Sequence, residues 1–302
     1  MTLRHFINST DISADELRKV LQLSTASIDA LGKPLAGLGA ALIFEKPSNR
    51  TRHSMELAVV QLGGHPVYTR GEEVGLDVRE TVEDITKVMG GYHAVLAARV
   101  FDHNIVRRMA DSSSVPVVNM LSDRQHPLQG LADVLTMQQQ LGDLVGKTVC
   151  YVGDYNNVAR SLAQASALMG MHVRLGCPNG YQAEDGELQA LQKLGAASVE
   201  QFDNIEEAVE GSHAVHTDVW TSMGQESETN KREKAFASFQ VTESLMKDAA
   251  ADAIFMHCLP AHRGMEVSAE VIDGSRSKVI EQAHNRMHAA RGLLAFLMGV
   301  NV

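Results

Sequence analysis

The chain has 302 residues, of which 44% are hydrophobic and 21% are charged, and its formal net charge at pH 7 is −10. This composition is typical of a folded protein long enough for two domains, and it excludes a disordered chain. The negative balance argues against nucleic acid or an anionic membrane surface as a partner. The sequence shows neither a signal peptide nor an apolar run of about 18 residues, so we expect a cytoplasmic protein without a membrane span.

The cysteine and histidine residues argue against disulfides and metals. Cys150, Cys177 and Cys258 are far apart and form no Cys-x-x-Cys pair, as is usual for reduced thiols in the cytosol. His284 and His288 could share one face of a helix, but no acidic third ligand or general base completes a zinc helix with them. We therefore expect no metal site.

The first half of the chain alternates between expected strands and helices. Residues 13–16 form a capping box that opens a first helix, and the apolar run Gly39–Phe44 is typical of a buried parallel strand. The next elements expected are helices over 50–62, 80–90 and 104–110 and strands over 65–69, 93–98 and 115–119. This alternation predicts a doubly wound parallel sheet.

A second unit of the same kind is expected after a linking helix. Pro127 is well placed to begin a helix that runs to Leu141 and carries the chain between domains. The polar stretch 221–239 is typical of a functional lid or a disordered loop. The other elements expected are strands over 148–152, 172–175, 213–219, 253–257 and 278–280 and helices over 157–169, 187–194, 205–210, 243–251 and 285–298. The predicted fold class is α/β, with two doubly wound parallel-sheet domains joined by interdomain helices.

The stretch Phe44–Arg52, FEKPSNRTR, places a polar loop between the buried strand and the next helix. Ser48 or Asn49 can cap this helix, whose free N–H groups and dipole favour an anion at its N-terminus. Arg50 and Arg52 add positive charge, so the loop has the chemistry of a cradle for a phosphate or a similar dianion. The alternative for this loop alone is a capped helix with two solvated arginines.

Polar residues at the carboxyl ends of parallel strands are considered together, because ligands of open sheets bind there. Such residues are Ser48–Arg52, Arg99, His126 and Gln129 in the first half and Asn157, Asp218, Ser222, Cys258 and Arg286 in the second. The first set suits a dianion and a carbonyl group, whereas an acid with an amide suits an amino acid. We therefore expect a cleft between domains for a phosphorylated acyl donor and an amino acid. Singly, each residue has a structural alternative, such as a small core position for Cys258.

Six motifs together resemble the ornithine carbamoyltransferase family, in its order and spacing, over essentially the whole chain. They are FEKPSNRTR at 44–52, HPLQ at 126–129, GDYNN at 153–157, DVWTSMG at 218–224, HCLPAHRG at 257–264 and NRMH at 285–288. The SMG loop and HCLP resemble the ornithine branch of the transcarbamoylases and not the aspartate branch. The resemblance implies transfer of the carbamoyl group of carbamoyl phosphate to L-ornithine, which yields L-citrulline and phosphate.

The resemblance also implies how the site residues divide between the two substrates. Those implied for carbamoyl phosphate are Ser48, Asn49, Arg50, Thr51, Arg99, His126, Gln129, Cys258, Leu259 and Arg286. Those implied for ornithine are Asn157, Asp218, Ser222 and Met223. Arg99, His126, Asp218 and Cys258 would be the catalytic residues. In this scheme Arg99 and His126 contact the carbonyl oxygen, and Cys258 lies near the attacking δ-amine.

The domains and assembly implied are those of the family. Residues 1–135 would bind carbamoyl phosphate, with the C-terminal helix 285–302 packed back on them, and residues 136–284 would bind ornithine. The resemblance implies a homotrimer, or a multiple of trimers, with sites at subunit interfaces, and it implies no cofactor or metal. Asn49 stands where family members often have Thr, and His284 stands where they often have Glu.

The reaction constrains the protonation state of the acceptor. A δ-amine resembles lysine, with an unperturbed pKa of about 10.4, and only its neutral form attacks a carbonyl. Arg99, Arg286 and desolvation would favour that form, and Arg99, His126 and Thr51 would stabilise the oxyanion. The rivals are a relative that uses putrescine, a catalytically silent relative, and a nucleotide-binding dehydrogenase. Residues 153–157 argue against the last, because they lack the Gly-x-Gly-x-x-Gly turn.

Overall fold

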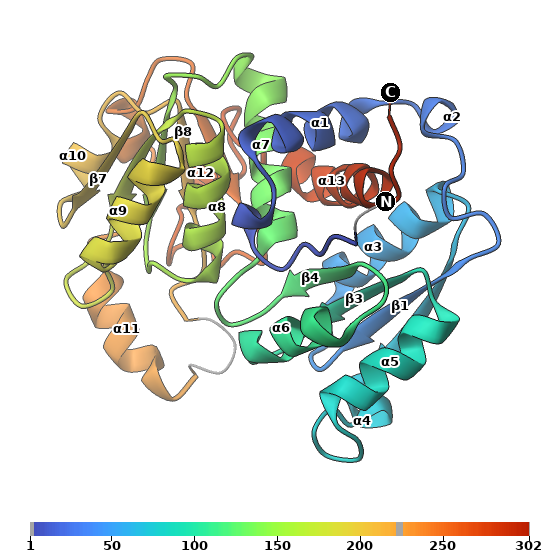
Figure 1. Ribbon diagram of the computed structural model, residues 1–302. Helices are drawn as coiled ribbons and strands as arrows, with labels where there is room; N and C mark the ends of the chain where they lie inside the picture. The colour runs from blue at the N-terminus through green and yellow to red at the C-terminus, as the bar shows by residue number, and fades with distance from the viewer. Residues whose placement is uncertain (1–2, 222–225, 302) are drawn as a thin grey trace. The chain divides into compact units, whose positions relative to one another are not determined.

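The computed structural model describes residues 3–221 and 226–301, which form two parallel β-sheets with flanking helices (Figure 1). The chain divides into two compact units: unit 1 is Met1–Ala132 with His284–Val302, and unit 2 is Asp133–Ala283. The expected α/β fold with two parallel-sheet domains is confirmed. None of the helices in the described ranges is both long and apolar enough to cross a bilayer.

Unit 1 contains a four-stranded sheet in the order β2-β1-β3-β4. Its strands are β1 (Gly39–Phe44), β2 (His65–Arg70), β3 (Val95–Arg99) and β4 (Val117–Leu121). Its helices are the 3-10 turn η1 (Ser9–Asp11), α1 (Ala14–Thr25), α2 (Ile28–Leu31), α3 (Asn49–Gln61), α4 (Gly71–Val74), α5 (Val82–Tyr92) and α6 (His103–Ser112). Two further helices, α7 (Pro127–Leu141) and α13 (Val279–Leu297), contribute residues to both units. The register pairs Phe44 with Arg99, so the loops that follow β1 and β3 leave the sheet at the same edge.

The apolar sequence of β1 explains its position in the middle of the sheet. Ala41 and Ile43 belong to a core that also contains residues of α5 and α6, and these two helices cover one face of the sheet while α3 lies on the other (Figure 1). The capping box predicted for α1 is confirmed: the Ser13 hydroxyl accepts from the Glu16 N–H, and the Glu16 carboxylate accepts from the Ser13 N–H. Local sequence and burial therefore determine these elements together.

Helix α13 packs closely on α1 within unit 1. The Arg291 guanidinium donates to the carbonyl oxygens of Ser24 (2.9 Å) and Ala26 (3.0 Å), where its charge suits the C-terminus of α1. Gly292 lies so close to α1 that an added Cβ would stand 2.2 Å from the Ser24 hydroxyl oxygen and 2.7 Å from the Val20 carbonyl oxygen. Only glycine fits this contact without a shift of one helix.

Gly292→Ala is therefore expected to destabilise the protein. Overpacking costs about 1–3 kcal/mol, which outweighs the gain of up to about 1 kcal/mol expected for Ala in a helix. Urea unfolding followed by circular dichroism measures the change. Gly91→Ala is the matched control, because a Cβ at this position of α5 meets no atom within 4 Å, and it should be neutral or stabilising. A Gly292→Ala protein as stable as wild type would contradict the close contact.

Unit 2 contains a five-stranded parallel sheet in the order β7-β6-β5-β8-β9. Its strands are β5 (Thr148–Val152), β6 (His172–Gly176), β7 (Ser198–Phe202), β8 (Ala214–Thr217) and β9 (Ile254–His257). Its helices are α8 (Asn157–Leu168), α9 (Asp185–Leu194), α10 (Ile205–Val209), α11 (Thr229–Phe236) and α12 (Ala269–Ile272), with 3-10 turns η2 (Glu226–Glu228) and η3 (Leu245–Lys247). β5 lies in the middle of this sheet, and its end leads directly into the loop that begins α8.

Several features of unit 2 differ from the expectation, among them the short helix α12, which was not predicted. The edge strand β7 was not predicted, because its residues are only half-buried and its sequence, SVEQF, carries two polar side chains between its few apolar ones. The strand over 278–280 is wrong, since α13 already begins at Val279. The helix over 243–251 is wrong, because only the short turn η3 forms there. The polar stretch 221–239 contains α11, whose Phe236 is fully buried in the core.

Candidate active site

The loop after β1 presents the N-terminus of α3 with short polar side chains. Ser48 is the N-cap residue of α3, but its side chain makes no capping hydrogen bond to the backbone. Its hydroxyl instead donates to Thr51 Oγ1 at 3.0 Å. The Ser48 side chain therefore leaves the first N–H groups of α3 for an anion, as expected for a phosphate cradle.

Two buried arginines meet at Thr51, although they are far apart in the sequence. Arg286 on α13 donates from Nη2 to Thr51 Oγ1 at 2.8 Å, and Arg99 at the end of β3 donates from Nη1 to the same oxygen at 3.4 Å. Each arginine has only 5% of its surface exposed. Two like charges held together in a buried place repel each other, so a bound anion would be strongly favoured there.

His126 and Gln129 complete this cluster at the start of α7. Arg286 Nη1 donates to Gln129 Oε1 at 3.0 Å and lies 3.3 Å from His126 Nε2. Burial lowers the pKa of His126 well below its ordinary value, and the charges of Arg286, Arg99 and Arg50 lower it further. His126 is therefore neutral at pH 7, and a neutral imidazole can donate one hydrogen bond to a carbonyl oxygen.

The other residues of the FEKPSNRTR loop lie nearer the surface. Asn49 is exposed at the first position of α3, and Arg50 is half-buried. Arg52 turns to α3 and β2 instead: its Nε donates to Glu56 at 2.8 Å, and its guanidinium lies 3.8 Å from the centre of the Tyr68 ring. Arg52 therefore takes part in neither of the contacts that unite Arg99 and Arg286 at Thr51.

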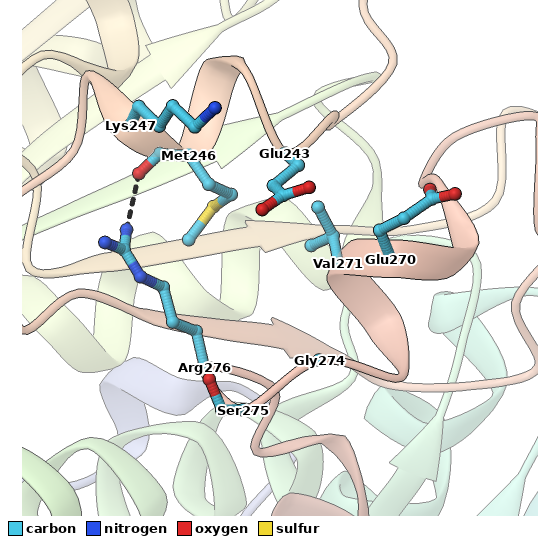
Figure 2. A pocket seen from close by; sticks show the side chains of 8 residues that line it. All are labelled: Glu243, Met246, Lys247, Glu270, Val271, Gly274, Ser275 and Arg276. Carbon is cyan, nitrogen blue, oxygen red and sulfur yellow. Dashed lines mark hydrogen bonds between the residues drawn. The ribbon is translucent and has the colours of Figure 1, made fainter.

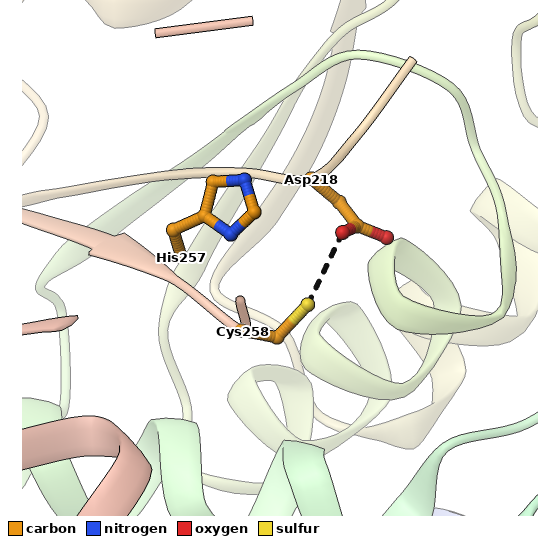
Figure 3. Close-up of side chains that lie close together, drawn as sticks. All are labelled: Asp218, His257 and Cys258. Atoms are coloured by element: carbon orange, nitrogen blue, oxygen red, sulfur yellow. Dashed lines mark hydrogen bonds between the residues drawn. The ribbon is translucent and has the colours of Figure 1, made fainter. Parts of the chain in front are cut away.

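Unit 2 brings Asp218 and Cys258 together beyond the ends of β8 and β9 (Figure 3). The Cys258 thiol donates to Asp218 Oδ1 at 3.2 Å, and the Asn156 amide donates to Asp218 Oδ2 at 3.1 Å. Both Asp218 and Cys258 are buried. This arrangement is a buried polar cluster at the carboxyl edge of the sheet, where ligands of such sheets bind.

Asn156 is a site residue that the sequence did not assign. It is the N-cap of α8, and its Oδ1 accepts from the N–H groups of Val158 (2.9 Å) and Ala159 (3.0 Å). The predicted residue Asn157 is the first residue of α8, and the hydrogen bond to Asp218 comes from Asn156. The position of Asn156 just before a helix is a signal that could have identified the cap, but its contact with Asp218 joins residues far apart in the chain.

The His257 ring holds the loop that follows β9. Its Nδ1 accepts from the Leu259 N–H at 2.9 Å, and its Nε2 lies 3.3 Å from Glu266 Oε1. Burial alone would raise the pKa of Glu266, but hydrogen bonds from His257 and the His262 N–H lower it. Leu259 has a φ of +58°, which is unusual for a residue other than glycine. The loop is thus held in a strained conformation next to Cys258.

Asp218, His257 and Cys258 each offer one atom that could bind a metal, and these atoms lie within 4.8 Å of one another (Figure 3). Both ring nitrogens of His257 are already engaged, one with the Leu259 N–H and the other with Glu266. A metal at this place would have to break one of these contacts. The geometry therefore does not favour a metal at these three residues.

Ser222 and Met223, which the sequence assigns to ornithine, lie outside the described residues. On their C-terminal side, α11 is tied to the loop after β5 by Arg232, which is 3% exposed. Its guanidinium donates to the Asp154 carboxylate and to the Trp220 carbonyl oxygen. Burial raises the pKa of Asp154, against the opposing effect of this hydrogen bond. No sequence pattern indicates Arg232, because its partners are distant in the chain.

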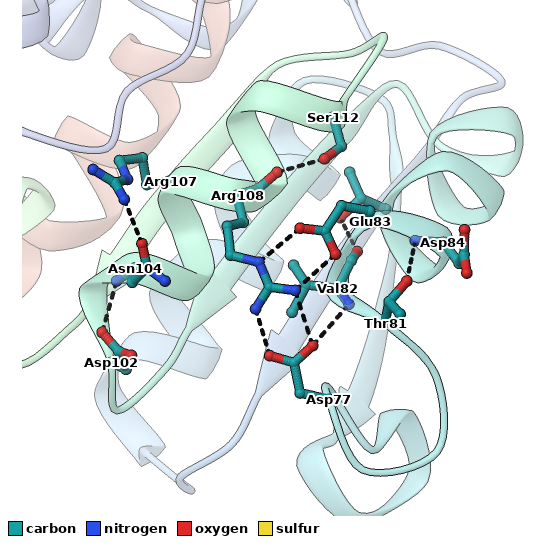
Figure 4. Close-up of polar contacts among 11 residues, drawn as sticks. Asp77, Thr81, Val82, Glu83, Asp84, Asp102, Asn104, Arg107, Arg108 and Ser112 are labelled. Carbon is teal, nitrogen blue, oxygen red and sulfur yellow. Dashed lines mark hydrogen bonds and ion pairs between the residues drawn. The ribbon is translucent and has the colours of Figure 1, made fainter.

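Asp77, in the segment 70–79, belongs to an ion-pair cluster with Glu83 and Arg108 that the sequence did not predict (Figure 4). The Arg108 guanidinium on α6 makes two hydrogen bonds to Asp77, at 2.5 and 3.0 Å, and two to Glu83, at 2.6 and 2.7 Å. These hydrogen bonds lower the pKa of both carboxyl groups. The cluster joins the loop before α5 to α6.

Arg108→Met is expected to remove stability in a pH-dependent way. The pKa values of Asp77 and Glu83 in the folded protein lie below their ordinary values of 3.8 and 4.5. The cluster therefore stabilises the protein at a pH above the ordinary values. This stabilisation is lost as the pH falls through the pKa values of the folded protein. The difference in free energy of unfolding between wild type and variant should therefore be present at neutral pH and decrease below about pH 4. Urea unfolding across this range measures it. Arg107→Met is the control, since Arg107 donates to the neutral amide of Asn104. An equal pH dependence of stability in both variants would contradict the stabilising role of the Arg108 cluster.

A surface pocket of about 240 Å³ in unit 2 contains none of the predicted site residues (Figure 2). It is lined by Glu243, Met246, Lys247, Glu270, Val271, Gly274, Ser275 and Arg276. The Arg276 guanidinium already donates to the Met246 carbonyl oxygen at 2.5 Å, and the acidic and basic side chains are mixed. This pocket offers no concentrated charge for a phosphate, so the candidate site is the set of loops at the strand ends.

Comparison with known proteins identifies the family of this chain. Residues 4–139 match the family described as "Aspartate/ornithine carbamoyltransferase, carbamoyl-P binding domain", and residues 145–297 match "Aspartate/ornithine carbamoyltransferase, Asp/Orn binding domain". The chain is 45% identical over 304 residues to the ornithine carbamoyltransferase of Parasynechococcus marenigrum, with 98% of this chain and 94% of that relative covered.

Solved structures agree with this result. The structure of ornithine carbamoyltransferase from Pyrococcus furiosus is 40% identical, has a TM-score of 0.92, and is matched over 99% of this chain and 98% of that chain. The enzyme from Thermus thermophilus is also 40% identical, with a TM-score of 0.88 and coverage of 99% and 100%. The chain therefore belongs to the aspartate/ornithine carbamoyltransferase family and is an enzyme that transfers a carbamoyl group.

Proposed function

We propose that this enzyme transfers the carbamoyl group of carbamoyl phosphate to L-ornithine and forms L-citrulline and phosphate. One observation carries the proposal: the buried side chains of Arg99 and Arg286 both donate to Thr51 Oγ1, next to neutral His126 and the N-terminus of α3. The relatives named ornithine carbamoyltransferase support ornithine as the acceptor. A role in arginine metabolism follows from the same assignment.

On the donor side, unit 1 supplies positive charge and hydrogen-bond donors for carbamoyl phosphate. The N–H groups of α3 at Asn49 and Arg50 and the hydroxyl groups of Ser48 and Thr51 would bind the phosphate. Arg99 would bridge a phosphate oxygen and the carbonyl oxygen, as its planar guanidinium allows. Gln129 would hold the carbamoyl amino group, and Arg286 would add charge beside it.

On the acceptor side, Asp218 would bind the α-ammonium group of ornithine, and Asn157 with residues 222–223 would bind the carboxylate. The Cys258 thiol, which donates to Asp218, would lie near the δ-amine. Putrescine lacks a carboxylate, so it would make no contact of this kind with Asn157. The division of groups therefore favours an amino-acid acceptor.

The proposed reaction is a direct attack of the neutral δ-amine on the carbamoyl carbon. A C–N bond forms, the carbonyl oxygen gains negative charge, and hydrogen bonds from Arg99 and His126 stabilise that charge. The C–O bond to phosphate then breaks, phosphate leaves, and the amine loses one proton, which the departing phosphate can accept. The positive charges of Arg99 and Arg286 would disfavour a charged amine and so lower its pKa in the site.

The test is citrulline formation from carbamoyl phosphate with L-ornithine, run beside putrescine, N-acetyl-L-ornithine and L-aspartate. Selective turnover of L-ornithine is the expected result. Turnover of another acceptor in its place, or no turnover in folded protein that binds carbamoyl phosphate, would overturn the proposal.

We also propose, from the resemblance to the family, a homotrimer located in the cytoplasm. Sedimentation equilibrium would then give three times the mass of one chain. A monomeric protein with full activity would contradict the trimer.

A further inference from the structure

Tyr151 is the largest of the fully buried side chains, and the roles proposed so far do not use it. It is the fourth residue of β5, and its ring stacks on His216 of β8 with 5.8 Å between the ring centres. A ring in this position fills the core between the strands and α8. Phenylalanine would fill the same space, so packing alone does not explain the hydroxyl group.

The hydroxyl of Tyr151 lies at the carboxyl edge of the sheet. A Cβ built on Gly153, the residue that follows β5, would stand 3.7 Å from this hydroxyl and 3.8 Å from the hydroxyl of Thr217, the last residue of β8. Asp218 comes directly after Thr217. Because Gly153 has no side chain, no side chain at this position lies against the buried Tyr151 hydroxyl.

Among the residues that the structure describes, the Tyr151 hydroxyl has no hydrogen-bond partner. A buried hydroxyl without a partner is unfavourable, and most such groups in proteins are satisfied. Burial raises the pKa of Tyr151 well above its ordinary value, and nearby Asp218, Asp154 and Cys258 raise it further, so the group stays a neutral phenol. A neutral phenol can accept one hydrogen bond and donate another.

We propose that the Tyr151 hydroxyl is a further acceptor-binding group that contacts the α-ammonium group of the amino acid together with Asp218. The ammonium N–H groups donate to the phenol oxygen of Tyr151 and to the carboxylate of Asp218. Binding of the acceptor then satisfies the hydroxyl. The inference rests on the proposed function, because it assumes that an amino acid binds at Asp218.

The test compares Tyr151→Phe with wild type through substrates and inhibitors that differ in one group. L-Norvaline keeps the α-ammonium and the carboxylate of ornithine but lacks the δ-amine, whereas 5-aminopentanoate keeps the δ-amine and the carboxylate but lacks the α-ammonium. Loss of one hydrogen bond to a charged group should raise KM for L-ornithine and Ki for L-norvaline about tenfold. Ki for 5-aminopentanoate and KM for carbamoyl phosphate should not change.

A stability measurement separates this role from a structural one. Because Tyr151→Phe removes a buried hydroxyl that has no described partner, its Tm should equal or exceed that of wild type. Tyr181→Phe is the matched control: its hydroxyl also lacks a partner among the described residues, but its ring packs on Phe236, with 4.7 Å between ring centres. That variant should bind L-ornithine like wild type.

Three results would overturn the inference: an unchanged KM for L-ornithine, an equal rise in Ki for both inhibitors, or a lower Tm of Tyr151→Phe. Failure of the proposed function can be distinguished from failure of this inference, because wild type would then form no citrulline from L-ornithine. In that case the role of Tyr151 would be refuted as well. Wild-type turnover with an unaffected variant would overturn only the role of Tyr151.

Discussion

Arg99→Ala is expected to lower kcat for citrulline formation about a thousandfold while the protein remains folded. The Arg99 guanidinium is 5% exposed and shares Thr51 Oγ1 with Arg286, so it is fixed before the substrate arrives. A fixed charge at a developing oxyanion stabilises the transition state more than the ground state, and loss of one such donor typically lowers kcat by about 10²–10³. Loss of the contact with the phosphate adds to this effect.

The measurement is steady-state kinetics with both substrates varied, together with a thermal unfolding curve. Because the substitution removes one of two neighbouring buried positive charges, Tm should not fall by more than a few degrees. Arg107→Ala is the control, since Arg107 on α6 carries the same charge but contacts only Asn104 in the described contacts, and its kcat should equal that of wild type. A folded Arg99→Ala enzyme with a near-normal rate would refute the proposed donor site.

Asp218→Asn is expected to raise KM for L-ornithine about a hundredfold with little change in KM for carbamoyl phosphate. Asparagine has nearly the same shape and can still accept one hydrogen bond from Asn156 or Cys258, but it no longer carries the charge that pairs with an ammonium group. Loss of a charge-assisted hydrogen bond of about 1.5–3 kcal/mol corresponds to a loss of affinity of about 10- to 100-fold. The exposed Asp203 offers a matched control, Asp203→Asn, which should leave both KM values unchanged.

The effect on the two substrates decides between two roles of Asp218. If Asp218 serves the acceptor, isothermal titration of carbamoyl phosphate gives the same affinity for variant and wild type. If the affinities for both substrates fall equally, Asp218 acts by holding the loops of unit 2 in place, and the proposed division of the site would be wrong.

The central strands were predictable because a short apolar run in the sequence indicates a strand that is buried on both faces. GAALIF and TVCYV are apolar runs with no alternation, which only a strand between two neighbours and two layers of helices can bury, and β1 and β5 have the predicted bounds. The strand β7 was missed because an edge strand needs only half-burial, so its sequence shows little of its position. Val279 and Ile280 were assigned to a strand by their β-branched side chains, but the helix α13 continues through them, and tertiary packing outweighs such weak preferences.

The motifs by themselves identified the family, because the order of polar residues at successive strand ends is a property of the sequence. Three other features were decided only by the tertiary structure. Asn156 contacts Asp218, Arg232 contacts Asp154, and the Tyr151 hydroxyl lies beside Gly153 and Thr217 without a partner in the described ranges. Tyr151 and Gly153 are two positions apart, but the other contacts join residues more than 60 positions apart. The pairing of β5 with β8 brings the loops that follow these two strands together. Sequence determines which chemistry each strand end carries, whereas the register of the folded sheet decides which of these groups meet.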